Sequence, residues 1–128
     1  MLHRRVRSLA DLRQVVEDGL PVDALERTVA RFELEPGAAS DIKYRIVPKT
    51  TLQRRLRLTV EESERLERLA RMTALAEDVW EEAALAREFL LTAQPQLGDE
   101  RPVDLARTDL GTRQVEQLLM RLEHALPS

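Results

Sequence analysis

LTVEESERLERLARMTALAEDVW, residues 58–80, is the stretch of this chain that most clearly predicts a helical fold. Thr59 and Glu62 have the spacing of a capping box, in which each side chain accepts a hydrogen bond from the other residue's backbone amide. Behind them, apolar or small side chains recur every three or four positions for about five turns, as they do on one face of an amphipathic helix. We therefore predict a long helix that ends near Trp80.

Shorter helices are predicted on both sides of this stretch. The six prolines fall between periodic segments and mark helix ends, while Ser8 and Gly19 have the residue types of an N-cap and a C-terminal stop. No alternating pattern typical of strands extends beyond a few residues, so the fold class is predicted to be all-α. The expected helices span residues 9–18, 22–34, 36–46, 48–57 and 83–91, and a last one follows Gly111. Residues 92–108 are expected to form a loop with at most one short turn, at 103–105.

Composition excludes several classes of function. The chain has 128 residues, 43% of them hydrophobic and 34% charged, which is enough for one domain or two very small ones. It has no cysteine, and its two histidines, His3 and His124, lie near the ends, so we expect no catalytic residues, no metal site, no cofactor and no enzyme activity. No apolar run approaches the roughly 18 residues of a membrane-spanning helix, and the N-terminus lacks the apolar core of a secretory signal. We therefore expect a soluble, cytoplasmic protein.

Charge is distributed unevenly along the chain. The net charge of -3 divides into +4 for residues 1–57, with 12 basic and 8 acidic residues, and -7 for residues 58–128, with 8 basic and 15 acidic residues. Residues 42–60 contain six cations and no acid. Such a basic stretch is typical of contact with a phosphate backbone, although a solvated helix face has the same composition.

Two short helices joined by a turn, the second of them basic, indicate a helix-turn-helix over residues 36–46 and 48–57. In this arrangement we expect Leu52 and Leu56 to face the core. The remaining side chains of the second helix are then free to contact phosphates or base edges, since Arg suits guanine and Gln suits adenine. The predicted DNA-binding residues are Lys49, Thr50, Thr51, Gln53, Arg54, Arg55 and Arg57.

VPKTTLQRR at residues 47–55 and LTVEESERLERLAR at residues 58–71 resemble the Xre/MbcA/ParS family of bacterial antitoxins. Members of that family carry an R-T-L-x-R-R stretch followed by L-S-x-E-E-S-x-R-L-x-R-L-A-R. The resemblance extends over residues 8–126. It has four departures, Thr50 for the usual Arg, Ile46 for Gly, Phe89 for Trp and Ala125 for Gly, of which the first two bear on the DNA sequence that would be read.

The resemblance implies two parts: an N-terminal helix-turn-helix and dimerisation region, residues 1–58, and a C-terminal helical toxin-binding domain, residues 59–128. It implies a RES-domain toxin as partner, a class that consumes NAD or transfers ADP-ribose, and operator DNA of the chain's own operon. For three apolar residues of this domain, Leu97, Pro102 and Leu105, two interpretations stay open: they contact the toxin, or they pack the loop against the last helix. With these three included, the predicted toxin-binding residues are Leu97, Gly98, Pro102, Leu105, Thr108, Gly111, Arg113, Gln114, Gln117 and Arg121.

Two features of the C-terminal half suggest how a toxin would be blocked. The last four of these residues are predicted to lie on the exposed face of the last helix, opposite Val115, Leu118 and Leu122. The acidic excess is expected to suit the basic mouth of a cleft that binds an anionic cofactor.

Two-fold operators require two-fold proteins, so we predict a homodimer formed mainly through Leu9, Leu12, Val16 and Leu25 of the N-terminal helices. The alternative to an antitoxin is a stand-alone DNA-binding regulator without a toxin partner. A neighbouring gene that encodes a RES domain would separate these two functions.

Overall fold

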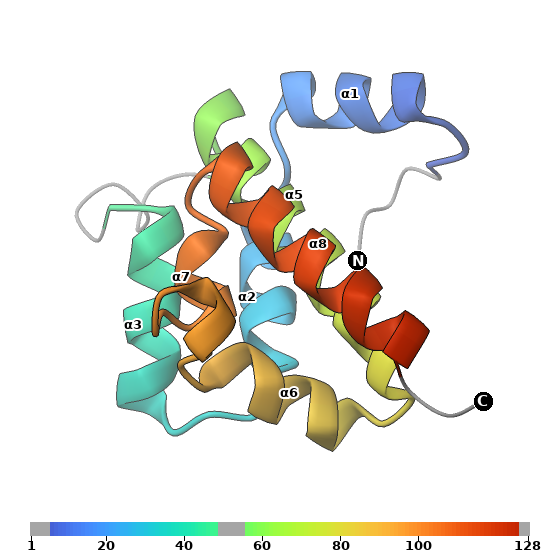
Figure 1. Ribbon diagram of the computed structural model, residues 1–128. Helices are drawn as coiled ribbons and strands as arrows, with labels where there is room; N and C mark the ends of the chain where they lie inside the picture. The colour runs from blue at the N-terminus through green and yellow to red at the C-terminus, as the bar shows by residue number, and fades with distance from the viewer. Residues whose placement is uncertain (1–5, 49–55, 126–128) are drawn as a thin grey trace. The chain divides into compact units, whose positions relative to one another are not determined.

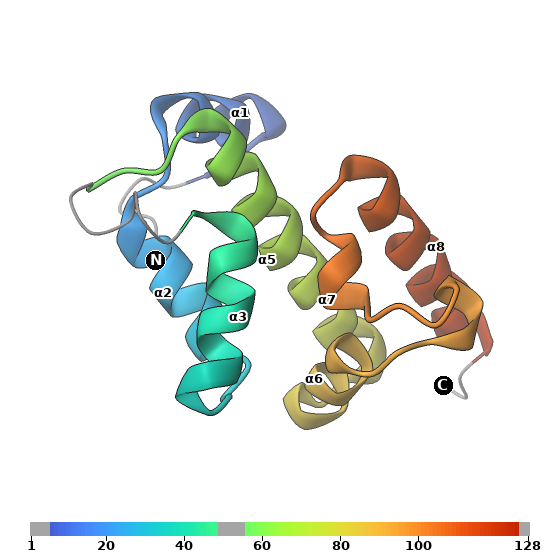
Figure 2. The same cartoon turned by 90° about the vertical axis from the view of Figure 1, so that its left-hand side faces the viewer.

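The computed structural model describes residues 6–48 and 56–125. Within these ranges all regular elements are helical, and extended pairing is limited to two isolated bridges, Pro21 with Arg57 and Gln94 with Glu100. The predicted all-α fold is confirmed. The α-helices, labelled in Figures 1 and 2, are α1 Leu9–Asp18, α2 Val22–Ala30, α3 Pro36–Ile46, α5 Val60–Trp80, α6 Ala83–Leu91, α7 Pro102–Leu105 and α8 Asp109–Ala125. A 3₁₀ turn, η1 Pro95–Leu97, lies between α6 and α7.

The chain divides into two compact units, unit 1 with residues 1–67 and unit 2 with residues 68–128. This division falls inside α5, which contributes its first turns to unit 1 and the rest to unit 2. The boundary predicted after residue 58, between the helix-turn-helix region and the toxin-binding domain, stays a prediction.

Helix α1 begins and ends where the sequence predicted. The Ser8 hydroxyl accepts a hydrogen bond from the Asp11 amide at 3.1 Å, which satisfies one of the free amides of the first turn. At the other end Gly19 has φ 87°, a conformation that favours glycine, and a Cβ there would lie 2.5 Å from the Leu58 carbonyl oxygen. Glycine is therefore required at this turn both by the backbone and by the space.

Helix α2 is shorter than predicted, because it ends at Ala30 and not at Leu34. Three consecutive amides, those of Arg31, Phe32 and Glu33, donate to the carbonyl three residues earlier, so the chain tightens into a turn, and Glu33 then takes a positive φ of 51°. Phe32 is buried nonetheless. The apolar spacing was correct, but it continued past the end of the helix.

The core of unit 1 forms between α2, α3 and the start of α5. Helices α2 and α3 pack side by side, as both views show (Figures 1 and 2). The Leu20 amide donates to the buried Ser63 hydroxyl at 2.9 Å, which ties the turn before α2 to the first turns of α5. The buried apolar residues of this unit include Leu25, Val29, Phe32, Ile42, Ile46, Val47, Leu58 and Leu66.

The start of α5 has the predicted capping box. The Thr59 amide donates to Glu62 Oε1 at 2.8 Å, and the Glu62 amide donates to the Thr59 hydroxyl at 3.1 Å. Glu62 is buried, so its carboxylate caps the start of α5 inside the protein and not in solvent.

Residues 92–108 contain more structure than the predicted loop. Pro95 and Pro102 each occupy the first turn of a short helical segment, η1 and α7, where a missing amide hydrogen has little effect. Helix α8 begins at Asp109 and not after Gly111, because Thr108 caps it: its hydroxyl accepts from the Gly111 amide at 3.0 Å. Gly111, which was predicted to precede the last helix, thus lies in its first turn.

The core of unit 2 is made by one face of α5 together with α6, α7 and α8. Helix α7 packs against both α6 and α8, and η1 contacts α8. The tilted rings of Trp80 and Phe89 lie 5.9 Å apart between their centroids. The buried apolar residues of unit 2 include Leu69, Met72, Ala76, Ala86, Phe89, Leu90, Leu97, Val103, Leu105, Val115, Leu118 and Leu119.

Candidate functional site

The predicted DNA-binding segment has only its last residue within the described part of the chain. Arg57 is described, whereas the other six residues lie outside the described ranges, and their contacts with DNA stay a prediction. Leu52 also lies outside these ranges. The six are Lys49, Thr50, Thr51, Gln53, Arg54 and Arg55.

Unit 1 holds the chain on both sides of this segment. Before it, the guanidinium of Arg65 donates two hydrogen bonds to the Ile46 carbonyl oxygen, from Nε at 3.0 Å and from Nη2 at 2.8 Å. After it, the Val22 amide donates to the Leu56 carbonyl at 2.9 Å, and the Leu58 amide donates to the Leu20 carbonyl at 2.8 Å. The fold therefore fixes the backbone on both sides of the segment.

Arg57 has a structural contact that the sequence did not predict. Its Nη1 donates to the Gly19 carbonyl oxygen at 2.9 Å, so the guanidinium binds the end of α1. The residue pairs with Pro21 in an extended bridge and is not helical, which corrects the predicted end of the fourth helix. Leu56 is 88% exposed, so the prediction that it faces the core was wrong.

Two cations of the acid-free stretch are paired with acids from elsewhere. Lys43 Nζ lies 2.6 Å from Glu26 Oε1 of α2, and Arg45 Nε lies 3.4 Å from Asp41 Oδ2 one turn earlier in α3. The local positive charge is thus smaller in the fold than a count along the sequence suggests. The cations of residues 49–55 and Arg57 remain as the predicted positive surface.

The ten predicted toxin-binding residues fall into two groups in unit 2. Leu97, Pro102, Leu105 and Gly111 are buried, so their side chains belong to the core of the unit. The exposed group, which is available for direct contact with a partner, consists of Gly98, Thr108, Arg113, Gln114, Gln117 and Arg121.

The buried group shapes the junction between α7 and α8. A Cβ on Gly111 would lie 2.3 Å from the Leu105 carbonyl oxygen and 2.9 Å from the Thr108 hydroxyl, so α8 can approach α7 only with glycine at this position. Arg68 fastens the same junction, because its Nε and Nη2 each donate at 3.1 Å, to the carbonyls of Ala106 and Arg107. Sequence reasoning missed Arg68, since a bond to carbonyls nearly 40 residues away (separations of 38 and 39) leaves no local pattern.

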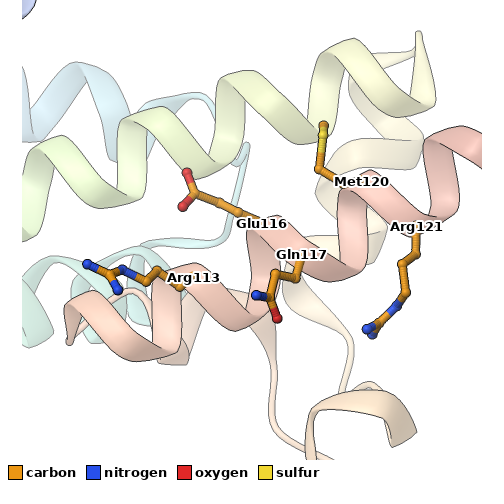
Figure 3. Close-up of a pocket in the computed structure, with 5 residues that line it drawn as sticks. All are labelled: Arg113, Glu116, Gln117, Met120 and Arg121. Carbon is orange, nitrogen blue, oxygen red and sulfur yellow. The ribbon is translucent and has the colours of Figure 1, made fainter.

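The exposed face of α8 carries a shallow groove of about 460 Å³, lined by Arg113, Glu116, Gln117, Met120 and Arg121 (Figure 3). In this view Gln117 and Arg121 extend from the side of α8 that is turned away from α5. Glu116 extends toward α5, where its carboxylate is paired with Arg71 Nε at 3.1 Å. The predicted exposure of the polar face of α8 is confirmed by this geometry.

Two other kinds of feature would bear on function, namely a membrane-spanning helix and a metal-binding group of side chains. No helix in residues 6–48 and 56–125 is long and apolar enough to cross a membrane. In the same ranges, no three histidine or acidic side chains come together as a metal ion would need.

Comparisons with known proteins match both halves of the chain. Residues 11–71 match the antitoxin Xre-like helix-turn-helix domain, and residues 75–125 match the antitoxin Xre/MbcA/ParS C-terminal toxin-binding domain. The chain is also 33% identical over 111 residues to "Antitoxin Xre" of Pseudomonas putida, an alignment that covers 84% of this chain and 67% of that protein.

Proposed function

The chain belongs to the Xre/MbcA/ParS antitoxins of type II toxin–antitoxin systems, and from this membership we propose that it binds and blocks a RES-domain toxin and represses its own operon. Unit 2, which contains the toxin-binding domain, acts on the toxin. Unit 1, which contains most of the helix-turn-helix domain, acts on operator DNA.

The exposed polar face of α8 is the observation that carries the toxin-binding proposal. Arg113, Gln114, Gln117 and Arg121 lie on one face of a 17-residue helix inside the matched toxin-binding domain. The opposite face, with Val115, Leu118 and Leu119, is buried in unit 2. A helix that is held in place by its buried apolar face loses little backbone conformational entropy when its polar face binds a partner.

Neutralisation in this proposal needs no chemistry by the antitoxin. The α8 face covers the cleft through which the toxin's substrate enters, and the toxin then cannot turn over. The antitoxin acts as a binding protein in the cytoplasm and not as an enzyme.

Co-expression with the product of the neighbouring gene, which this proposal expects to be a RES-domain protein, tests the proposal. We expect the two proteins to co-purify and the antitoxin to restore growth to cells that express the toxin. Replacing both Gln114 and Gln117 with alanine should weaken binding about tenfold, because two hydrogen bonds of about 0.7 kcal/mol each are lost. The matched control is Glu82→Ala, an exposed position between α5 and α6.

Two results would contradict this proposal. If the neighbouring gene product does not bind, the chain is a stand-alone regulator, which is the alternative function. If binding occurs but the double glutamine variant binds as tightly as the wild type, α8 is not the toxin-binding surface.

We also propose a homodimer that forms through unit 1, with a surface that differs in part from the predicted one. Val16 and Leu25 are buried within the unit and have no surface to offer a second copy, whereas Leu9 is 85% exposed and Leu12 is partly exposed. In the proposed dimer, Leu9 and the exposed part of Leu12 meet the same residues of the second chain across a two-fold axis.

Analytical ultracentrifugation tests the dimer. We expect a dimer at tens of micromolar for the wild type and a shift toward monomer for Leu9→Glu, because a carboxylate would be buried in an apolar contact. Arg13→Ala, an exposed change on the same helix, serves as the control. A monomeric wild type, both alone and with DNA, would remove this proposal.

A further inference from the structure

We infer that the toxin surface which docks on α8 is acidic, with an apolar side chain among its carboxylates, and is not the basic mouth that the net charge of the C-terminal half suggests. This inference rests on the proposed function, since it concerns the chemistry of the toxin's contact surface. The α8 surface is defined here as Leu110, Arg113, Gln114, Gln117, Met120 and Arg121, all exposed.

The acidic residues of unit 2 are concentrated away from this surface. Unit 2 has 11 acidic and 7 basic residues, and five of its acids lie in the short stretch 77–88, at the end of α5 and in α6. The net charge of the whole unit therefore does not predict the sign of the charge on the α8 surface. The five acids are Glu77, Asp78, Glu81, Glu82 and Glu88.

Helix geometry keeps the acids of α8 itself off the centre of its exposed face. Asp109, Glu116 and Glu123 recur every seven residues, so they share one edge of the helix. Glu116, for example, is rotated by about 100° around the helix axis from Gln117. Two of them are already paired, Asp109 with Arg113 at 3.0 Å and Glu116 with Arg71 at 3.1 Å. Glu123 is the third acid of this edge and makes no ion pair with another described residue, while the pair with Asp109 offsets part of the charge of Arg113.

The centre of the α8 surface carries cations and amides. Arg121 makes no ion pair with another described residue, and the side chain of Arg113 is 67% exposed even with its partner Asp109. Gln114 and Gln117 lie between the two arginines and add no charge. A partner that covered this surface with Lys or Arg would bring like charges together, whereas carboxylates would form charge-assisted hydrogen bonds with the guanidinium groups.

Apolar contact comes from the two ends of the same surface. Leu110 is 70% exposed at the start of α8, and Met120 is 39% exposed where it lines the groove. Methionine and arginine are both enriched in protein–protein contacts, so an apolar side chain of the partner can pack on Met120 beside the carboxylates that meet the arginines. The shallow groove that Met120 lines is the place for this contact.

A charge series at Arg121 tests the sign of the partner surface. The probe is the purified product of the neighbouring gene, which the proposed function expects to be a RES-domain protein. Its dissociation constant is measured by calorimetry for Arg121→Lys, Arg121→Gln and Arg121→Glu. We expect a graded loss of affinity, within about threefold for Arg121→Lys and at least tenfold for Arg121→Glu, because the new carboxylate would face carboxylates of the toxin. Arg113→Glu should weaken binding in the same direction.

The controls separate local charge from the field of the whole unit. Glu82→Lys changes the net charge of unit 2 by the same magnitude as Arg121→Glu but with the opposite sign, and it lies outside the α8 surface, so its dissociation constant should stay within twofold of the wild type. The affinity of the wild-type complex should fall as salt concentration rises, and the Arg121→Gln complex should respond less steeply.

Each outcome has a distinct meaning. Tighter binding by the Glu variants would show that the partner surface is basic, and equal binding would show that the α8 surface is outside the contact; either result overturns this inference and leaves toxin binding intact. Failure of the wild type to bind the probe contradicts the proposed function itself.

Discussion

Replacing Gly111 with alanine is expected to destabilise unit 2 by about 3 kcal/mol, since it forces an extra methyl group into a filled space. The Cβ would lie 2.3 Å from the Leu105 carbonyl oxygen, and the contact cannot be relieved by a side-chain rotation because the neighbour is backbone. Relief requires α7 and α8 to move apart. That movement would disturb both the Thr108 cap of α8 and the junction that Arg68 fastens.

Urea denaturation of the whole chain measures this effect, and Gly37→Ala is the matched control. A Cβ on Gly37 meets nothing within 4 Å, and the residue lies in α3, so alanine there should stabilise the protein by up to about 1 kcal/mol through its higher helix propensity. The two glycine-to-alanine changes are thus expected to have opposite signs.

The functional consequence of Gly111→Ala should be confined to toxin binding. Displacing α8 moves the whole α8 surface, whereas operator binding depends on unit 1 and should be retained. A Gly111→Ala variant as stable as the wild type would contradict the close approach of α7 and α8. Loss of toxin and DNA binding together would indicate general unfolding, which the urea curve would reveal.

Replacing Lys49, Arg54 and Arg55 together with alanine is expected to weaken operator binding about 100-fold, since three contacts of about 1 kcal/mol each are lost. If all three reach phosphates, the slope of log K against log salt should fall by about three units, because each neutralised phosphate releases close to one counterion. Fluorescence anisotropy over a series of salt concentrations measures both quantities. Unchanged affinity and slope in the triple variant would show that DNA binds elsewhere.

Arg57→Gln provides the comparison within the same basic stretch. The Arg57 guanidinium binds the Gly19 carbonyl, so its loss should loosen the turn after α1 and lower stability without changing the salt slope. A slope reduced by about one unit would show that the remaining amines of Arg57 also reach a phosphate. The pair of experiments therefore separates a residue that contacts DNA from one that positions the segment.

The sequence alone determined the local features of this fold. Ser8 and Gly19 bound α1, Thr59 and Glu62 cap α5, and Pro36 begins α3, each at the residue predicted. These features depend on backbone groups within a few residues of one another, so the residue types and their spacing contain the information. The same spacing carried the resemblance to the antitoxin family, which the comparisons confirm.

Local patterns were least reliable at helix ends. Apolar spacing continued through Phe32 although α2 ends at Ala30, and the last helix was predicted to follow Gly111 although α8 begins at Asp109. Phe32 is buried beyond the last turn of its helix, and the Thr108 cap places the start of α8 before Gly111. Apolar spacing alone therefore does not mark a helix end, because side chains outside a helix also enter the core.

Only the tertiary structure decided which of the predicted contact residues are available to a partner. Leu97 and Pro102 stood beside Arg113 and Gln117 in one predicted surface, yet the fold buries the first two and exposes the others. Arg57, Arg65 and Arg68 each donate to a backbone carbonyl 19 to 39 residues away. A long guanidinium side chain can reach any carbonyl that the fold brings near, so its partner is set by the packing of helices and not by the residues adjacent to it in the sequence.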